Sequence, residues 1–450
     1  MLGASLKTGF FHSNPKLQFA WNCAQIGILI FPLSPALGAV SLIVASVVTW
    51  LQQYRAIILR PLTQGFALLS LLFIISAAFA YDKTAAFLGL FNLLPFLLGF
   101  AAFTTLIQTT AQLRQVSWIL AITSLPVVVM GLGQMFLGWN LHLQILWIVL
   151  DWTIAPGGNP LGRMSSNFMY ANTLAGYLVI VFILNLGLWL ETYQLFRRQG
   201  DRETLPQGNF TASSPPLPLL FLTVTVIGNF LALILTDSRN AWAIAIAACL
   251  AYALLLGWRL LVAGVASVTT GVLLAAFAPS PIAELFRKFV PAFFWARLND
   301  QMYPDRPIAL MRKTQWKFAW SMAMQRPLTG WGLRNFTPLY KEKMHIWLGH
   351  PHNFFLMLSA ETGLPATLLF CGLLLWILVM GVQILLQFEF VEKEDKLTFF
   401  SYLVVFVGWI IFNTADVTLF DVRLNLLSWL ILFTFAGAVY HYKKLLANNN

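Results

Sequence analysis

Long runs of apolar residues, separated by short polar connections, repeat along nearly the whole chain. A helix needs about 20 apolar residues to cross the hydrocarbon core of a bilayer. The pattern therefore predicts an all-α, polytopic membrane protein with about twelve transmembrane helices. The approximate ranges of these predicted spans are 18–33, 35–52, 64–80, 86–107, 115–137, 172–191, 217–236, 240–257, 260–278, 354–386, 397–415 and 424–442.

Proline and glycine interrupt this pattern at two places. Pro32 and Pro35 separate the first two predicted spans into a tight hairpin. The tenth predicted span, 354–386, is too long for one straight crossing, so we expect Gly363 and Pro365 to kink or split it. No internal repeat is visible in the sequence.

Composition supports the same class of protein. Hydrophobic residues make up 59% of the chain and charged residues only 10%, and the mean hydropathy is +0.74. These values exclude a soluble globular domain, and we expect no nucleic-acid partner. Cys23, Cys249 and Cys371 lie in or beside apolar runs without metal-ligand spacing, which indicates packing residues.

The short connections predict the orientation of the chain. With the N-terminus inside, thirteen Lys and Arg residues fall in cytoplasmic connections and four fall in short external ones. Cytoplasmic loops are enriched in these residues, so both termini are predicted to be cytoplasmic. The four external cations are Lys83, Arg163, Arg239 and Arg423.

The longest hydrophilic stretch, 279–351, divides the chain into three parts. Spans one to nine occupy 1–278, this external loop follows, and spans ten to twelve occupy 352–450. The loop holds eleven Lys and Arg residues against four Asp and Glu, a net charge of +7. We expect a helix from a cap at Asp305 to about Gln325, lying on the membrane surface beside anionic head groups.

His352 and Asn353 stand where this loop meets the tenth predicted span, in the segment HPHNFFLMLSAETGLPATLLF. An imidazole titrates near neutral pH and can serve as a general base. An interfacial ring hydrogen-bonded to the backbone is the alternative, and His350 is a competing candidate. Glu361 is nine residues further, about 14 Å along a helix, so we expect it to support packing or a loop and not to pair with His352.

Arg163 and Arg239 are candidate anion ligands, because the guanidinium fork suits bidentate binding of phosphate oxygens. Both lie among hydrogen-bonding residues on the predicted side of His352. The alternative is that each arginine extends to phospholipid head groups. Asp237, two residues before Arg239, is a further alternative partner.

At these residues the chain resembles the O-antigen ligase and polymerase superfamily of bacterial membrane proteins. The resemblance lies in His352, Asn353, nine residues and Gly363, although the following Leu-Pro-Ala departs from the family's Gly-x-x-Gly ending. RPLTGWGLRNF (326–336), TDSRNAW around Arg239 and GRMSSNFMYANTLAGY around Arg163 resemble further family segments. The resemblance covers roughly 160–420.

The resemblance implies a glycosyltransferase in the bacterial inner membrane. It would move a glycan from an undecaprenyl-diphosphate carrier to a membrane-embedded acceptor at the periplasmic face, among membrane lipids. His352 would be the base, supported by Asn353, Glu361 and Gly363. The residues implied to bind the diphosphate are Arg239, Arg163, Arg312 and Arg334. No metal and no cofactor is expected, since no carboxylate cluster of the Asp-x-Asp kind is present.

Two other functions stay open at this point. The whole chain also resembles cyanobacterial proteins named bicarbonate transporters. Transporters commonly carry internal repeats and broken helices in matching halves, whereas this sequence has one interrupted span and no repeat. A non-catalytic glycan-binding or scaffold protein is the third possibility, and ligase and polymerase are not distinguished by these residues.

Overall fold

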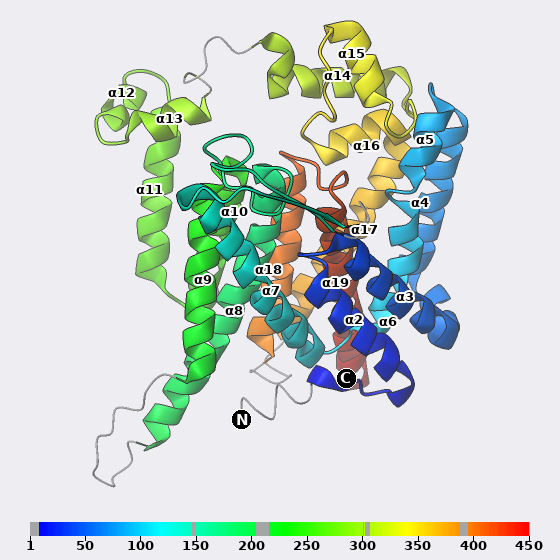
Figure 1. The fold of residues 1–450 in the computed structure, drawn as a ribbon, viewed down its shortest axis with the longest axis vertical. Coiled ribbons are helices and arrows are strands. Elements are labelled where there is room, and N and C mark those ends of the chain that lie inside the picture. Colours follow the sequence, from blue (N-terminus) through cyan, green and yellow to red (C-terminus); the bar gives the residue numbers. More distant parts are fainter. Residues whose placement is uncertain are drawn as a thin grey trace.

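A computed structural model describes residues 9–145, 150–203, 216–299, 301, 307–387 and 395–449. The described chain is almost entirely helical, with one short β-hairpin (Figure 1). The elements are η1 Pro15–Leu17, α2 Gln18–Ile30, α3 Pro35–Ile58, α4 Pro61–Ala78, α5 Lys83–Leu90, η2 Pro95–Gly99, η3 Phe100–Ala102, α6 Phe103–Leu106, α7 Thr110–Phe136, β1 Leu141–Ile145, β2 Leu150–Ile154, α8 Ala171–Glu203, α9 Leu217–Leu235, α10 Arg239–Leu255, α11 Arg259–Phe277, α12 Ile282–Arg287, α13 Ala292–Leu298, η4 Ile308–Leu310, α14 Arg312–Gln325, α15 Phe336–Met344, α16 Phe354–Thr362, α17 Leu364–Gln387, α18 Lys396–Asn413 and α19 Val422–Asn449.

The prediction of an all-α, multi-pass membrane protein is confirmed. Ten helical stretches among the described residues are long and apolar enough to cross a membrane. About twelve spans were predicted, and two of the predicted segments form helices shorter than the other ten. The segments predicted as spans one and eight form helices of 13 and 17 residues, α2 and α10. Their lengths, about 20 and 26 Å, fall short of the roughly 30 Å hydrocarbon core.

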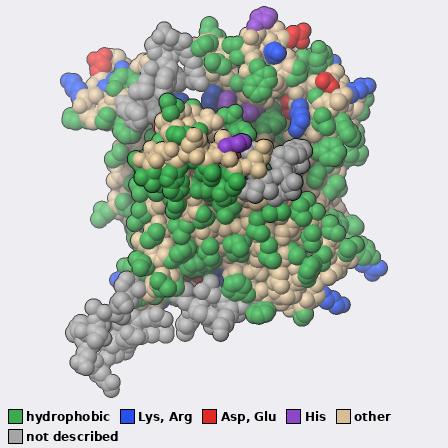
Figure 2. Space-filling view, viewed as in Figure 1, with side chains coloured by type: hydrophobic (Ala, Val, Ile, Leu, Met, Phe, Trp, Pro, Cys, Tyr) green, Lys and Arg blue, Asp and Glu red, His purple; other side chains and the backbone are tan. Residues whose placement is uncertain are grey.

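Burial separates central helices from peripheral ones. α8 and α19 are largely buried and pack with α18 in the main hydrophobic core. In α11, by contrast, few residues are buried, and in α3, α9 and α17 a third or fewer are buried. Figure 2 shows apolar side chains over the middle of one face and charged side chains gathered toward its two ends. This distribution fits a bundle whose peripheral helices face lipid.

Helices α12 to α16 lie at one end of the bundle, which we call the cap end (Figure 1). Here Phe318, Met322, Phe336, Tyr340 and Ala360 form a second, smaller core that joins α14 and α15 to α16. The predicted helix of this region is therefore present as α14. Its prediction as a membrane-surface helix is wrong for the face through Ala319 and Met322, because that face packs on protein.

The start of this helix also differs from the prediction. Asp305, the predicted cap, lies outside the described residues. Residues 308–310 form a separate 3₁₀ turn, and extended backbone at Met311 (φ −75°, ψ 131°) separates it from α14. The α-helix therefore begins only at Arg312.

The predicted break at Gly363 is confirmed, since α16 ends at Thr362 and α17 begins at Leu364. Gly363 has φ +84°, and a Cβ there would lie 2.5 Å from the Leu328 carbonyl oxygen. Gly330 sits equally close to the backbone of Glu361, and a Cβ on it would lie 2.4 Å from the Glu361 carbonyl carbon. Only glycine tolerates such approaches at positive φ. The loop 326–332 is thus fastened, backbone to backbone, onto the break between α16 and α17.

A short β-hairpin lies between α7 and α8, outside the predicted spans. Leu141–Ile145 and Leu150–Ile154 pair as an antiparallel hairpin. The indole N–H of Trp152 donates to the Leu33 carbonyl at 2.6 Å. This bond places the hairpin over the α2–α3 connection.

Candidate functional site

The turn that carries His352 is held by groups from three elements. The Trp316 indole of α14 donates to the Pro351 carbonyl at 3.0 Å. Asn353 caps α16, since its side-chain oxygen accepts the Leu356 N–H at 2.9 Å, and its Nδ2 donates to the Thr414 carbonyl beyond α18 at 2.9 Å. The turn is therefore fixed between the cap-end helices and the end of α18.

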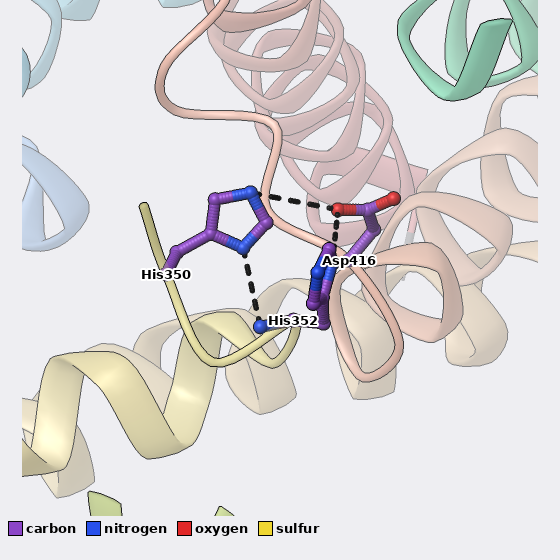
Figure 3. A group of neighbouring side chains, drawn as sticks. All are labelled: His350, His352 and Asp416. Atoms are coloured by element: carbon purple, nitrogen blue, oxygen red, sulfur yellow. Dashed lines mark hydrogen bonds and ion pairs between the residues drawn. The ribbon is translucent and has the colours of Figure 1, made fainter. Parts of the chain in front are cut away.

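Asp416, in the α18–α19 connection, is the carboxylate beside this turn. Its Oδ1 lies 3.4 Å from His352 Nδ1 and 3.9 Å from His350 Nε2 (Figure 3). The two rings approach each other edge to face, with centroids 4.5 Å apart. Oδ1 also accepts the Val417 N–H at 2.9 Å. We call His350, His352 and Asp416 the His–Asp cluster.

The protonation states of the cluster follow from burial and charge. Burial lowers the pKa of His350 to about 4, helped by the neighbouring His352 and Arg312 and opposed by Asp416. Burial alone would raise the pKa of Asp416. The hydrogen bond from His352, the charges of both rings and the Val417 N–H outweigh it, so this pKa lies below its usual value. At neutral pH His350 is uncharged and Asp416 is ionised.

This arrangement gives His352 the geometry of a general base. A carboxylate that accepts the Nδ1 proton fixes the ring tautomer and leaves the Nε2 lone pair free to accept a proton. No hydrogen bond within the described part of the chain reaches His352 Nε2. The side chain keeps 29% of its surface exposed, against 21% for His350. His352 is therefore the more accessible ring.

By distance alone the three side chains could hold a metal ion, because their ligand atoms lie within 4.8 Å of one another. The tautomer of His350 argues against it. The backbone N–H of His352 donates to His350 Nδ1 at 3.1 Å, so Nδ1 of His350 carries no proton. The proton of the neutral His350 ring is therefore on Nε2, the atom nearest Asp416. Ligating histidines typically donate their second ring N–H to an acceptor. The donor set therefore fits a hydrogen-bonded cluster better than a metal centre.

The structure connects Arg163 to this cluster through one side chain. Arg163 donates from Nη2 to Asn172 Oδ1 at 2.5 Å and from Nε to the Thr236 carbonyl at 2.8 Å. Asn172 Nδ2 in turn donates to Asp416 Oδ2 at 3.1 Å. Arg163, Asn172, Asp416 and His352 thus form a continuous hydrogen-bonded row.

Arg239 belongs to the same neighbourhood. It is the first residue of α10 and its side chain is exposed. Its turn contains Thr236, which accepts from Arg163, and Asn240, whose Nδ2 donates to the Phe412 carbonyl at 3.0 Å. The turn is therefore held against the end of α18, beside the connection that carries Asp416.

The remaining predicted residues divide between the two ends of α16. Arg312 begins α14 and lies near enough to His350 for its charge to lower the pKa of that ring. Arg334 is exposed and lies by Gly89, on the side of α5. Glu361 Oε1 accepts the Phe336 N–H at 3.1 Å. Arg312 thus lies beside the His–Asp cluster, whereas Arg334 is in the loop that leads into α15 and Glu361, in α16, binds the start of α15.

Asp416 and Asn172 were not among the residues singled out from the sequence. Asp416 lies 64 residues after His352, in a segment that reads as a simple connection. One signal was present, because an acidic residue at the end of an apolar span is costly to bury and usually functional. Asn172 stands within the segment GRMSSNFMYANTLAGY, in which only Arg163 was predicted to be a functional residue.

Comparison with known proteins gives one family. Residues 223–371 match the O-antigen ligase family. The matched segment runs from α9 to the first turns of α17 and contains Arg239, Arg312, Arg334, His352, Asn353, Glu361 and Gly363. Arg163, Asn172 and Asp416 lie outside it. No curated protein matches the chain.

Proposed function

We propose that this chain is an O-antigen ligase-like glycosyltransferase of the bacterial inner membrane. It transfers a glycan from an undecaprenyl-diphosphate carrier to a hydroxyl of a membrane-embedded acceptor, with the cap end at the periplasmic face and both termini in the cytoplasm. The observation that carries the proposal is the His352–Asp416 pair beside Arg312, in which His352 and Arg312 lie inside the family segment 223–371 and Asp416 lies after it.

The reaction needs one proton acceptor and one anion-binding region. His352 Nε2 takes the proton of the acceptor hydroxyl as its oxygen attacks the anomeric carbon. The bond from that carbon to the carrier phosphate breaks, and its electron pair leaves with the diphosphate. Asp416 stabilises the imidazolium that forms, and the ring later returns its proton to water.

The cations stabilise the charge that develops on the leaving diphosphate. Arg239 is exposed and begins α10, directly after the turn whose Thr236 carbonyl accepts from Arg163, and Arg312 lies near enough to His350 for its charge to act on that ring. Donors arranged before the reaction stabilise developing charge most effectively where water is excluded. We assign Arg239 to the diphosphate, with Arg312 as a second cation. Arg334 is the weaker candidate, because it lies toward α5.

The full-length protein in proteoliposomes provides the test. The donor is a radiolabelled undecaprenyl-diphosphate oligosaccharide, and the acceptor is a bacterial glycolipid fraction. We expect transfer to the glycolipid, and His352→Gln should lower it roughly 10²- to 10⁴-fold, the usual contribution of a general base. His142→Gln, in the exposed β-hairpin, is the matched control and should transfer normally.

The other outcomes have definite meanings. Label that lengthens the carrier-linked chain without reaching the glycolipid would indicate a polymerase. Unchanged transfer by His352→Gln would contradict the catalytic assignment. Uptake of radiolabelled bicarbonate by the same vesicles, without glycan transfer, would overturn the proposal in favour of the transporter hypothesis.

A further inference from the structure

We propose that Arg163 and Asn172 act together as a positioning pair that holds Asp416 in one hydrogen-bonding state and so orients the His352 ring. This inference rests on the proposed function. It gives Arg163 a role different from the diphosphate contact that the family resemblance implies.

The argument starts from the donors and acceptors available. A guanidinium has only donors, whereas a carboxamide has an acceptor oxygen and a donor nitrogen. The Asn172 atom that faces Arg163 Nη2, 2.5 Å away, must therefore be Oδ1. This fixes the amide, so Nδ2 faces Asp416 Oδ2 at 3.1 Å. Asn172 can then only donate to Asp416, and a donor favours the carboxylate over the carboxylic acid.

Both carboxylate oxygens of Asp416 therefore act as hydrogen-bond acceptors. Oδ2 accepts from Asn172, and Oδ1 accepts from the Val417 N–H and faces His352 Nδ1. Because Oδ1 acts as an acceptor, it can accept a hydrogen bond from His352 Nδ1–H but cannot donate one to that nitrogen. The ring is then oriented with Nε2 directed away from the carboxylate, as the proposed base requires.

Arg163 is itself fixed in place, since its Nε donates to the Thr236 carbonyl. Two faces of the guanidinium fork are therefore bound to protein, one to a backbone carbonyl and one to Asn172. The pair joins the loop before α8, the α9–α10 turn and the α18–α19 connection. Arg239 lies in that α9–α10 turn, so the same contact also sets the distance between the anion-binding region and the base.

Asn172→Asp is the most direct variant, because it preserves size and still accepts from Arg163 but no longer donates to Asp416. We expect it to lower kcat of glycan transfer roughly 10- to 100-fold, the effect of losing a hydrogen bond to a charged group, with the donor KM nearly unchanged. Asn172→Ser should have a higher kcat than Asn172→Asp, since a hydroxyl can both accept a hydrogen bond and donate one. Asn159→Asp is the control, because Asn159 donates to the Met169 carbonyl in the same loop.

A double-mutant cycle separates the pair from independent contributions. Arg163→Ala and Asn172→Ala should lower kcat by similar factors, and the double variant should be hardly worse than either, because both remove one connected interaction. Arg239→Ala should instead raise the donor KM and multiply with Asn172→Ala. A raised donor KM in Arg163→Ala, or multiplicative loss in the Arg163–Asn172 pair, would overturn the inference.

A readout without turnover separates failure of the inference from failure of the function. Diethyl pyrocarbonate modifies neutral imidazole, and mass spectrometry locates the product. In Asn172→Ala Asp416 loses its amide donor and the His352 ring loses its fixed orientation, so the rate at which His352 is labelled should change several-fold, with His142 unchanged. Unaltered labelling of His352 would reject the positioning pair. Altered labelling in a protein that transfers no glycan would reject only the transferase.

Discussion

Helix α18 carries a partly buried charged cluster at each of its ends, and the two clusters are built differently. Before its first turn, Asp395 lies 3.3 Å from Arg114 of α7, and Glu191 of α8 binds the same guanidinium at 2.6 Å. After its last turn stands the His–Asp cluster. Each cluster draws a residue from α8, Glu191 at one end and, through its hydrogen bond to Asp416, Asn172 at the other.

The two clusters differ in whether their polar atoms all have hydrogen-bond partners. Arg114 donates from Nε and Nη2 to Glu191, Thr398 donates to Glu191, and Tyr442 donates to Asp395. In the Arg114 cluster, the guanidinium and both carboxylates are therefore bound by other protein groups. The His–Asp cluster instead contains a ring nitrogen, His352 Nε2, that no described residue occupies. The first cluster therefore connects helices through ion pairs, whereas the second contains the ring that the proposed function uses as a base.

The largest effect should come from the same substitution made at both ends. Asp416→Asn removes the negative charge beside His352 and replaces one acceptor oxygen by an amide donor, so the side chain can no longer accept from both Asn172 and His352. We expect transfer to fall roughly 10²- to 10⁴-fold with the fold retained. Asp395→Asn should leave turnover per folded molecule within about 2-fold. The proteoliposome assay, with folded protein counted by size-exclusion chromatography, compares them. Equal loss of turnover in both would remove the distinction.

Arg114→Ala should produce the largest change in stability. It leaves the Glu191 and Asp395 carboxylates without their cation, and breaking a buried pair typically costs about 3–5 kcal/mol. Reversible unfolding in detergent measures the free energy of unfolding. Arg197→Ala, near the end of α8 and exposed, is the control and should change little. A loss below about 1 kcal/mol would show that the Arg114 cluster is dispensable.

The pH dependence of stability should come from the His–Asp cluster. The pKa of His350 is lowered to about 4, whereas an unfolded chain binds this proton near pH 6.5. Between these values the unfolded state holds more protons, so stability is complete above pH 6.5 and falls as pH drops toward 4, by up to about 3 kcal/mol. Thermal melts of wild type and His350→Gln test this. A parallel pH slope in the variant would assign the loss to other groups.

The smallest effects should come from single neutral hydrogen bonds. Asn353→Ala removes the cap of α16 and its bond to Thr414, and we expect a loss of about 1 kcal/mol. Tyr442→Phe, at the other end, removes bonds to Thr110 and Asp395 at a similar cost, about 1 kcal/mol. Asn353→Ala should also reduce transfer, since it loosens the turn that carries His352, whereas Tyr442→Phe should not.

The sequence was informative about segments and much less so about which segments meet. Apolar run length predicts the class of fold, and the Gly363 break follows from a run too long for one crossing. The position of His352 beside a predicted loop was also visible. Run length does not show that the α18–α19 connection folds onto that loop, because the contact of Asp416 with His352 depends on how helices pack.

Arg163 illustrates the same limit. Its place outside a predicted span suggested a ligand for an anion, yet its neighbours Thr236 and Asn172 come from elements 73 and 9 residues away. Local pattern cannot reveal that a guanidinium is already bound by a distant carbonyl. The shortness of α2 was missed for another reason, since the apolar run continues through Phe31, although the helix ends at Ile30.

The backbone of His352 has φ +52°, in the left-handed region. A side chain there is unfavourable by roughly 1–2 kcal/mol relative to the right-handed form, and glycine adopts the region freely. Position 352 therefore carries an imidazole side chain although its backbone conformation favours glycine. Such a conflict between backbone preference and side-chain chemistry is expected at functional positions. His352→Gly should consequently be inactive yet no less stable than wild type, which makes it the natural form in which to capture a bound carrier lipid for structure determination.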